Sequence, residues 1–408
     1  MKCHLVGIGG VGMSALAVAM LRSGHEVTGS DRNLASPNVA MLEGFGVRVF
    51  PDDGSGVDSS LDELVVSSAI EQTNKDLVKA RELSLRVIHR APALARTLSD
   101  KKLVAVAGTC GKTTVTALLG HILAEAGLDP FCVNGANVPG WEGAVRAGSG
   151  EFAVAEVDES DKSLTAFHPY AAIVTNASSD HYPKEEMDEV FDAFIKDLPG
   201  PLVDGRDARG ILSSDETREA VRKTLKMPGR HNIDNAVAAV SMAMALGVAK
   251  DAAIASLATF KGVERRLQRH SERVYDDYAH NPEKLRAMWV ALGDLYPGGV
   301  CVVWRPHGYG PLKKMMDDLA QMFNETVRKQ DKLLLLPVFD AGGTAERSVN
   351  SDILAAKIED GKCELVADHD EAFERCRAYA DRFAAFATAG ARDHLLPSLA
   401  RRIAQALA

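Results

Sequence analysis

Short apolar runs alternate with helix-like stretches along the whole chain of 408 residues. The first run, residues 3–8, leads into a glycine turn, a helical stretch from about residue 12 and a second apolar run at 25–30. This alternation is typical of parallel sheets covered by helices. The chain also exceeds the length that one hydrophobic core usually spans. We therefore predict an α/β protein of several domains.

The predicted strands fall into three groups along the chain. Short polar stretches separate the groups near residues 99 and 269. We predict three domains, at 1–98, 99–268 and 269–408. The strands expected in them lie at residues 3–8, 25–30, 47–50, 63–67 and 86–88, then 103–107, 152–156 and 171–175, and finally 273–276, 300–304, 332–337 and 386–389.

Composition excludes several classes of protein. Hydrophobic residues make up 46% and charged residues 25% of the chain, which argues against extensive disorder. The net charge is −9 without a basic run, so nucleic acid is not an expected partner. No apolar run approaches the roughly 18 residues of a membrane span, so we expect no membrane insertion. The first residues lack the pattern of a signal peptide and the six cysteines lack metal-ligand spacing, so we predict a cytoplasmic protein with free thiols.

The first glycine turn reads GIGGVGMS at residues 7–14. It lies between an apolar run and a helical stretch, and Asp31 follows 19 residues after Gly12. Glycines let the backbone approach a diphosphate closely, and the N-terminus of a helix offers unpaired N–H groups. Taken alone, the motif indicates dinucleotide binding and hydride transfer. A tight turn without a ligand is the alternative explanation.

The second glycine turn, GTCGKTT at residues 108–114, changes this interpretation. It follows the apolar run 103–107 and is a shortened P-loop, because Val106 occupies the position of the first glycine in the longer pattern. Its backbone N–H groups can bind phosphates, Lys112 can reach the β- and γ-phosphates, and the Thr113 hydroxyl can hold Mg²⁺. Two glycine turns in successive domains indicate a nucleoside triphosphate and a second phosphorylated ligand.

At this point the sequence resembles the Mur ligase family. The similar segments follow the family's order and cover nearly the whole chain: GIGGVGMS, GSD at 29–31, VVSSAI at 65–70, AVAGTCGKTTV at 105–115, EVDESD at 156–161, IVTN…DH ending at His181, PGRHNIDNAVAA at 228–239, FKGVERRL at 260–267 and YDDYAHNP at 275–282.

The resemblance implies a Rossmann-like N-terminal domain that binds a UDP-sugar, a central P-loop ATPase domain and a Rossmann-like C-terminal domain that binds the amine. It also implies that ATP phosphorylates a carboxylate and that an amine then attacks the acyl phosphate. Within the family, the similarity is strongest to the ligases that join L-alanine to UDP-N-acetylmuramate in peptidoglycan precursor synthesis. The implied cofactors are ATP and Mg²⁺.

The resemblance also assigns roles to individual residues. Catalysis is expected from Lys112, Glu156, His181 and Arg266, and Mg²⁺ binding from Thr113, Glu156 and His181. The expected ATP contacts are Gly108, Thr109, Gly111, Lys112, Thr113, Thr114, Asn232, Asn235, Arg266, Asp277 and His280. The expected UDP-sugar contacts are Gly9, Gly10, Val11, Gly12, Asp31, Ser67, Ser68 and Ala69.

Some of these residues have simpler structural explanations, which the sequence leaves open. Asn232 could cap a helix instead of binding adenine. Arg265 could meet the phosphate in place of Arg266, or both arginines could complete the dipole at the end of a helix. Taken alone, Glu156 could be a solvated acid and His181 a surface histidine.

The stretch expected to bind the amine departs from the family pattern. There the family carries a PHRYTR-like sequence with one histidine and two arginines, whereas residues 305–311 read RPHGYGP. His307 is kept, but Gly308 and Pro311 replace the arginines. Either other cations replace these arginines in binding the acceptor, an amino acid or a short peptide, or the amine substrate differs from that of the family.

Three cations could replace the missing arginines: Lys313, Lys314 and Arg392. We predict that Lys313 or Lys314, at the start of a helix at 312–323, carries part of the contact with the acceptor carboxylate. The alternative is that both lysines are solvated helix residues.

Other functions stay open at this point. A murein tripeptide ligase of peptidoglycan recycling is the alternative within the same family. A nicotinamide-dependent oxidoreductase and a non-catalytic sugar-nucleotide sensor belong to different classes. The P-loop argues against the oxidoreductase, and the retained Lys112, Thr113, Glu156 and His181 argue against a sensor.

Overall fold

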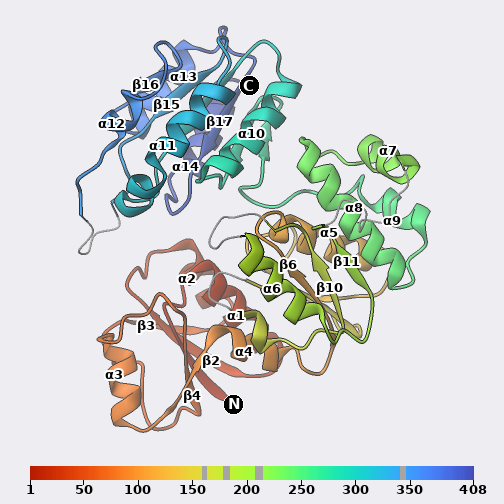
Figure 1. Cartoon of the computed structure of the whole chain (residues 1–408). Helices are drawn as coiled ribbons and strands as arrows, with labels where there is room; N and C mark the ends of the chain where they lie inside the picture. The colour runs from red at the N-terminus through yellow and green to blue at the C-terminus, as the bar shows by residue number, and fades with distance from the viewer. Residues whose placement is uncertain (159–162, 178–183, 207–214, 341–345) are drawn as a thin grey trace. The chain divides into compact units, whose positions relative to one another are not determined.

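The computed structural model describes residues 1–158, 163–177, 184–206, 215–340 and 346–408 (Figure 1). The chain divides into two compact units, Met1–Lys226 with Ile233–Gly262, and Met227–Asn232 with Val263–Ala408. The first unit contains two sheets and the second contains one. The predicted α/β fold with three sheets is confirmed.

The first sheet has five parallel strands in the order β3-β2-β1-β4-β5. Their bounds are β1 (Lys2–Val6), β2 (Glu26–Asp31), β3 (Arg48–Pro51), β4 (Glu63–Val66) and β5 (Arg86–His89). The helices between them are α1 (Val11–Arg22), α2 (Pro37–Gly44), α3 (Lys75–Glu82) and α4 (Arg90–Thr97).

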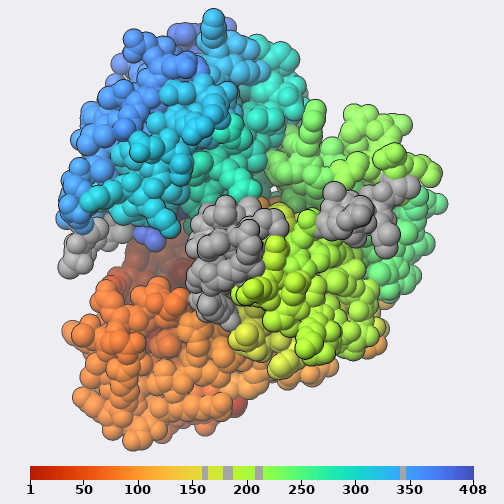
Figure 2. Space-filling model, viewed as in Figure 1, coloured from red at the N-terminus to blue at the C-terminus, as the bar shows by residue number. Residues whose placement is uncertain are grey.

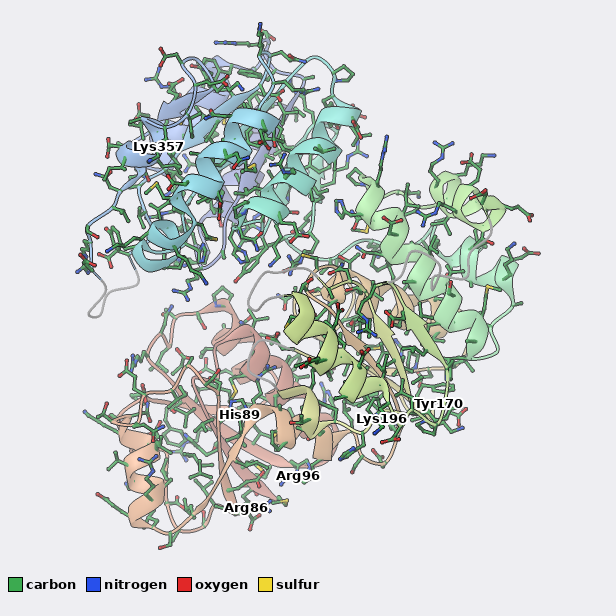
Figure 3. All side chains as sticks on the ribbon, in the orientation of Figure 1. Arg86, His89, Arg96, Tyr170, Lys196 and Lys357 are labelled. Carbon is green, nitrogen blue, oxygen red and sulfur yellow. The ribbon has the colours of Figure 1, made fainter. Side chains whose placement is uncertain are left out.

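Helices cover both faces of this sheet. Successive side chains of a strand point to opposite faces, and here apolar side chains are buried on both faces. Cys3 and Leu5 of β1 belong to a core shared with α1 and α4, whereas Val6 packs in a second cluster with Leu77 of α3. The Arg96 side chain of α4, labelled in Figure 3, forms an ion pair with the buried Glu63 at the start of β4.

The second sheet has the order β11-β10-β6-β9-β7-β8, and only the edge strand β8 runs antiparallel to its neighbour among the described pairings. Its strands are β6 (Lys102–Ala107), β7 (Phe131–Val133), β8 (Val145–Ala147), β9 (Phe152–Glu156), β10 (Ala171–Val174) and β11 (Leu202–Asp204). The associated helices are α5 (Lys112–Glu125), η1 (Ser163–Ala166), α6 (Lys184–Ile195), α7 (Asp215–Thr224), α8 (Arg230–Ala245) and α9 (Lys250–Ser256).

The two sheets of the first unit share one hydrophobic core. Residues of α1 and α4 pack in the same cluster as Phe131 and Val133 of β7. At the edge of this contact, Arg22 donates two hydrogen bonds of 2.6 Å each to the Glu142 carboxylate. The bidentate geometry adds specificity to the apolar contact.

The second unit holds a six-stranded sheet in the order β12-β13-β17-β14-β15-β16. Its strands are β12 (Gln268–Ser271), β13 (Val274–Asp277), β14 (Val300–Trp304), β15 (Lys332–Leu335), β16 (Cys363–Leu365) and β17 (Ala385–Ala389). Its helices are α10 (Pro282–Leu295), α11 (Tyr309–Thr326), α12 (Ser351–Ala355), α13 (His369–Ala378) and α14 (Leu396–Ala406). The described residues after Val263 form one body in Figure 2.

Each face of this sheet has its own core. Val302 and Trp304 of β14 pack with Trp289 of α10 and Phe323 of α11, while Cys301 and Val303 belong to a cluster with residues of α13 and α14. Figure 1 shows α10 and α11 side by side over one face. All five residues of β14 are buried, alternately in one core and the other, which explains why a continuous apolar run forms a central strand.

The structure extends the predicted element list mainly at the sheet edges. The short strands β7, β8, β11, β12 and β16 were not predicted, because three or four residues carry too little pattern to be recognised. The helix expected at 312–323 is longer and begins at Tyr309. None of the described helices is long and apolar enough to cross a lipid bilayer.

Candidate active site

The P-loop predicted at residues 108–114 connects β6 to α5. Gly108 and Gly111 have positive φ angles of 124° and 86°, which glycine adopts without steric strain. A Cβ atom at Gly111 would overlap the side chain of Asn235, and one at Gly108 would overlap Thr175. The loop therefore needs glycine at both positions for space as well as for backbone conformation.

Two residues that follow β10 hold this loop in place. The Asn176 Oδ1 atom accepts hydrogen bonds from the Thr109 hydroxyl (2.6 Å) and the Cys110 N–H (2.9 Å), and its Nδ2 donates to the Cys110 carbonyl (3.0 Å). Thr175 donates to the same carbonyl at 2.6 Å. No role was predicted for Thr175 or Asn176, although the run IVTN at 173–176 was the available signal.

Lys112 is the first residue of α5, and only 12% of its side chain is exposed. Its Nζ donates to the Gly108 carbonyl at 2.6 Å and lies 4.0 Å from an oxygen of Asp158. Thr113 and Thr114 follow in the first helical turn and are buried. The positive N-terminus of α5 and the Lys112 ammonium together form a site suited to phosphate.

Glu156 ends β9 at the same edge of the second sheet. It lies opposite Val106 of β6 in the strand register, and its Oε2 accepts a hydrogen bond from the Gly135 N–H at 2.9 Å. A Cβ atom at residue 135 would overlap the Glu156 carboxylate, so glycine allows this close approach. The structure thus brings Lys112, Thr113 and Glu156 to one sheet edge.

The metal-binding prediction rests on this edge. Within the described ranges, no group of three or more histidine, cysteine, aspartate and glutamate side chains forms a metal site. The Thr113 hydroxyl and the Glu156 carboxylate are hard oxygen donors, which suit Mg²⁺. His181, the third predicted ligand, lies outside the described residues.

The two asparagines predicted to bind adenine both belong to α8. Asn235 lies against Gly111 of the P-loop. Asn232, one turn earlier, donates its Nδ2 to the Pro228 carbonyl at 2.7 Å. Because α8 begins at Arg230, Asn232 lies inside the helix, and the alternative that it is the N-cap residue is wrong.

The first glycine turn lies at the carboxyl edge of the first sheet, between β1 and α1. The Gly9 N–H donates to Asp31 Oδ2 at 2.8 Å, and the other oxygen of Asp31 accepts from the Asn33 N–H. A Cβ atom at Gly9 would lie 2.9 Å from both the Asp31 carboxylate and the Ser36 hydroxyl, so only glycine fits. Asp31 therefore shapes the turn in addition to its predicted contact with the sugar nucleotide.

The helix that follows this turn has an open N-terminus. Gly10 precedes the helix, and Val11, its first residue, is 47% exposed. The turn at residues 67–70, which contains Ser67, Ser68 and Ala69, follows the neighbouring strand β4 and contacts Gly7 through Ile70. All the predicted UDP-sugar contacts thus lie along one sheet edge.

Arg90, which was not among the predicted site residues, adds a positive charge to this edge of the sheet. A Cβ atom at Gly12 would lie 3.2 Å from a terminal guanidinium nitrogen of Arg90. Arg90 begins α4 directly after β5, about 80 residues after the turn, so no local motif connects the two. Its guanidinium is suited to a diphosphate bound at the N-terminus of α1.

The structure separates the roles of Arg265 and Arg266 in the second unit. Arg265 has a positive φ angle of 58°, forms an ion pair with the buried Asp276 at 3.0 Å and donates to the Gly390 carbonyl. The Arg265 side chain is therefore bound to groups of the second unit itself. Both arginines lie in a turn before β12, so the alternative that they complete a helix dipole is wrong.

Asp277 and His280 follow at the carboxyl end of β13. The Asp277 oxygens accept hydrogen bonds from the Leu267 and Ala279 N–H groups, at 2.7 Å each. Burial raises the pKa of Asp277, while Arg266 acts in the opposite direction. Burial also lowers the pKa of His280 to about 4, so His280 is neutral at pH 7.

His307, predicted to contact the amine, lies after β14 in the second unit. Its ring centroid is 4.8 Å from that of His280, and burial lowers its pKa to about 4, with further effects of Arg392 and Lys284. Lys313 forms an ion pair with Glu346 at 2.9 Å and is 56% exposed, and Lys314 is also exposed. The structure does not place either lysine beside His307.

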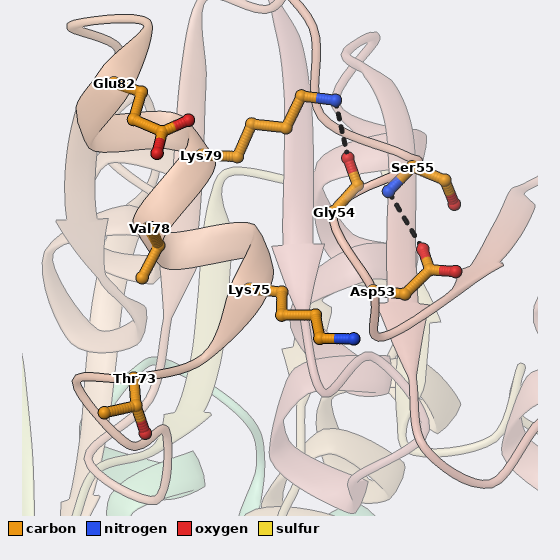
Figure 4. A pocket seen from close by; sticks show the side chains of 8 residues that line it. All are labelled: Asp53, Gly54, Ser55, Thr73, Lys75, Val78, Lys79 and Glu82. Atoms are coloured by element: carbon orange, nitrogen blue, oxygen red, sulfur yellow. Dashed lines mark hydrogen bonds between the residues drawn. The ribbon is translucent and has the colours of Figure 1, made fainter.

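A separate pocket lies between α3 and the loop after β3 (Figure 4). Its lining includes Lys75, Lys79 and Glu82 of the helix and Asp53 and Ser55 of the loop. Lys79, one of the two lysines of this pocket, donates a hydrogen bond to the Gly54 carbonyl at 3.0 Å. No residue predicted to bind a substrate lines this pocket.

Comparison with known protein families agrees with the three sheets. The model of the Mur ligase family, catalytic domain, matches residues 2–102, that of the Mur ligase middle domain matches 106–196, and that of the Mur ligase, glutamate ligase domain, matches 265–392. The matched segments follow one another in the order of the sheets.

Individual proteins match over most of the chain. The UDP-N-acetylmuramate–L-alanine ligase of Clavibacter michiganensis subsp. michiganensis is 35% identical, over 92% of this chain and 87% of that protein. The enzyme of the same name from Sinorhizobium medicae is 32% identical, over 87% and 86%.

Solved structures show the same fold. The UDP-N-acetylmuramate–alanine ligase of Thermotoga maritima has a TM-score of 0.78 at 23% identity, covering 99% of this chain and 98% of its own. A murein peptide ligase from Psychrobacter arcticus has a TM-score of 0.68 at 20% identity, covering 100% and 98%. With all three domain models matched in order and relatives above 30% identity along most of its length, the chain belongs to the Mur ligase family.

Proposed function

We propose that this ATP-dependent amide ligase joins L-alanine to the carboxylate of UDP-N-acetylmuramate in the synthesis of peptidoglycan precursors. Relatives at 32% and 35% identity carry this activity in their names. The proposal rests on one observation: in a chain this similar to those relatives, Lys112, Thr113 and Glu156 lie at the same edge of the second sheet, beside the P-loop. A cytoplasmic location is part of the proposal and is supported by the six free thiols.

The reaction has two steps. A carboxylate oxygen of the sugar nucleotide attacks the γ-phosphorus of ATP, and ADP leaves to give an acyl phosphate. The neutral amine then attacks the acyl carbon, phosphate leaves with the electron pair of the carbon–oxygen bond, and the nitrogen loses a proton to give the amide. Both steps depend on positioning and on neutralising phosphate charge more than on covalent help from the protein.

The first unit supplies groups for the phosphoryl transfer. The N–H groups at the start of α5 and the Lys112 ammonium would bind the β- and γ-phosphates. Thr113 and Glu156 would hold Mg²⁺, with His181 as the predicted third ligand, and the ion would reduce the charge repulsion between carboxylate and phosphate. The Asn176 bonds to the P-loop would keep its N–H groups oriented before ATP arrives.

The first glycine turn would bind the sugar nucleotide. Its diphosphate would lie at the N-terminus of α1, where Gly9–Gly12 leave the backbone accessible and Arg90 supplies a guanidinium. Asp31 and the turn containing Ser67, Ser68 and Ala69 flank this position on neighbouring strands. The P-loop and the family membership argue against hydride transfer at this turn.

Roles for residues of the second unit are proposals based on the resemblance. Arg266 is the proposed γ-phosphate ligand, since Arg265 is already bound to Asp276 and Gly390. Asp277 and His280 are the proposed partners of the ribose and the phosphates. By the same resemblance, adenine is assigned to Asn232 and Asn235 of α8, of which Asn235 belongs to the first unit.

Release of phosphate from ATP tests the proposed function. With Mg²⁺ present, release should require both UDP-N-acetylmuramate and an amine, and L-alanine should be used better than glycine, L-serine or the recycled tripeptide. No release with any amine would contradict ligase activity. Release with the tripeptide but with none of the amino acids would favour the second candidate, a murein peptide ligase. The Psychrobacter arcticus protein of that name has the same fold as this chain.

A further inference from the structure

Three adjacent parallel strands of the second unit end beside one another at one edge of the sheet. In the order β13-β17-β14, Ala389 of β17 lies opposite Asp277 on one side and Trp304 on the other. Ligands of open α/β sheets bind outside the carboxyl ends of the strands. The loops after these strands carry His280, Arg392 and His307, respectively.

The loop that carries Arg392 is fixed on both sides. Before it, the Gly390 N–H donates to the Asp277 carbonyl at 3.2 Å, and the Gly390 carbonyl accepts from Arg265 at 2.5 Å. After it, the Asp393 side chain is only 1% exposed and forms an ion pair with Arg305 at 2.8 Å. The same carboxylate oxygen lies 2.8 Å from His369 Nε2.

This fixed loop holds Arg392 in an uncommon backbone conformation. Its φ angle is +65°, in the left-handed region that few residues other than glycine adopt. Non-glycine residues in such conformations persist where the surrounding structure imposes them, and they cluster at functional sites. Here the hydrogen bonds of Gly390 and the contacts of Asp393 fix the backbone on both sides of Arg392.

The Arg392 guanidinium lies beside the residues expected to meet the amine. A Cβ atom at Gly308 would be 4.0 Å from one of its terminal nitrogens, and its charge helps to lower the pKa of His307. Residue 308 is one of the two positions where the family pattern has arginine and this chain does not. The Arg392 guanidinium, from a distant part of the sequence, thus lies near position 308, where the family pattern has an arginine.

Arg392 also differs from the other cations of this edge in its contacts. Arg305 and Arg265 are paired with buried aspartates, and Lys313 is paired with Glu346. In the part of the chain that the structure describes, Arg392 forms no ion pair and is exposed. Lys284 of α10 helps to lower the pKa of both His280 and His307, whereas Arg392 acts on His307.

We propose that Arg392 binds the carboxylate of the acceptor amino acid, in place of the arginines absent at positions 308 and 311. A guanidinium can bind a carboxylate through two parallel hydrogen bonds, which fixes the direction of the amino group as well as its distance. Arg392 then determines specificity for amines that carry a carboxylate. This inference rests on the proposed function.

The test compares L-alanine with L-alaninamide, which has the same amine but no carboxylate. In Arg392→Asn, where asparagine tolerates a positive φ angle, the KM for L-alanine should rise about 10- to 100-fold. The preference for L-alanine over L-alaninamide should largely disappear, while the KM values for ATP and UDP-N-acetylmuramate stay within about twofold. Arg392→Lys should keep part of the preference, because it keeps the charge without the paired hydrogen bonds.

Controls separate this inference from the proposed function. Arg401→Gln removes an exposed arginine from α14 and should leave every KM unchanged. If the wild-type protein releases no phosphate with any amine, the proposed function fails before the variants are compared. If Arg392→Asn keeps the wild-type preference, or if Lys284→Gln or Lys313→Gln loses it instead, the assignment to Arg392 is wrong.

Discussion

The side chain of Asn176 forms two hydrogen bonds with the backbone of Cys110: its Oδ1 accepts from the N–H at 2.9 Å, and its Nδ2 donates to the carbonyl at 3.0 Å. A single amide thus satisfies a donor and an acceptor in the middle of the P-loop. Asn176 follows β10, which pairs with β6, so the strand pairing itself brings the amide to the loop. The loop is shaped by its neighbouring strand as well as by its own glycines.

Asn176→Ala should weaken ATP binding without abolishing folding. The change removes the Asn176 acceptor of the Cys110 N–H, while the Cys110 carbonyl keeps its hydrogen bond from Thr175. Loss of a partner for such a group costs about 1–3 kcal/mol. We expect the KM for ATP to rise about tenfold or more. Asn324→Ala removes a side chain that likewise bonds to backbone groups, those of Lys357 and Glu359 after α12, and should leave this KM unchanged.

Lys112→Ala should stop ligation while leaving the binding of UDP-N-acetylmuramate nearly intact. The ammonium would face the phosphates of ATP, whereas the sugar nucleotide is assigned to the first sheet. We expect kcat to fall at least about 100-fold, as for other losses of a group that stabilises developing charge. Turnover assays and calorimetry with the sugar nucleotide measure the two properties separately.

Lys101→Ala is the matched control for this prediction. Lys101 also donates to a backbone carbonyl, that of Gly150, at 2.8 Å. It lies at the opposite end of β6 from the P-loop and should retain full activity. Equal loss of turnover and sugar-nucleotide binding in Lys112→Ala would show that the two sites are not independent.

Activity should require Mg²⁺ or Mn²⁺. Excess EDTA should remove it, and added Mg²⁺ should restore it. Glu156→Gln replaces a charged oxygen donor by a neutral one, so the Mg²⁺ concentration for half-maximal activity should rise about tenfold or more. Full turnover in EDTA, or an unchanged Mg²⁺ requirement in Glu156→Gln, would contradict the metal assignment.

The first unit should lose stability as the pH falls below about 6.5, partly through His4. This side chain is fully buried, and burial lowers its pKa from 6.5 to about 4. Because the unfolded state binds the proton more readily, the His4 contribution is present above pH 6.5 and is lost as the pH falls toward 4. The loss between pH 7 and pH 5 should be about 2 kcal/mol.

Urea unfolding of wild type and His4→Gln at both pH values measures this contribution. The variant should show a smaller loss of unfolding free energy on acidification, even if it is less stable at pH 7. His394→Gln, which removes an exposed histidine, should follow the wild type. Parallel curves for His4→Gln and wild type would mean that His4 titrates normally.

Local sequence patterns determined the glycine turns and the central strands of this protein. Gly108, Gly111 and Lys112 are neighbours in the chain, so the requirement for close backbone approach and a cation is visible in seven residues. The central strands are apolar because both of their faces are covered: residues 300–304 are all buried, alternately in the core on one face and the core on the other. Short edge strands such as β16 bury fewer side chains and gave no such signal.

Only the tertiary structure decided which distant residues complete each site. Asn176, Arg90 and Arg392 follow strands or begin helices far along the chain from the turns beside which they lie. Their positions depend on strand order, since parallel strands bring their carboxyl ends to one edge whatever their separation in sequence. The sequence therefore determined the chemistry of the turns, and the strand order determined which side chains meet there.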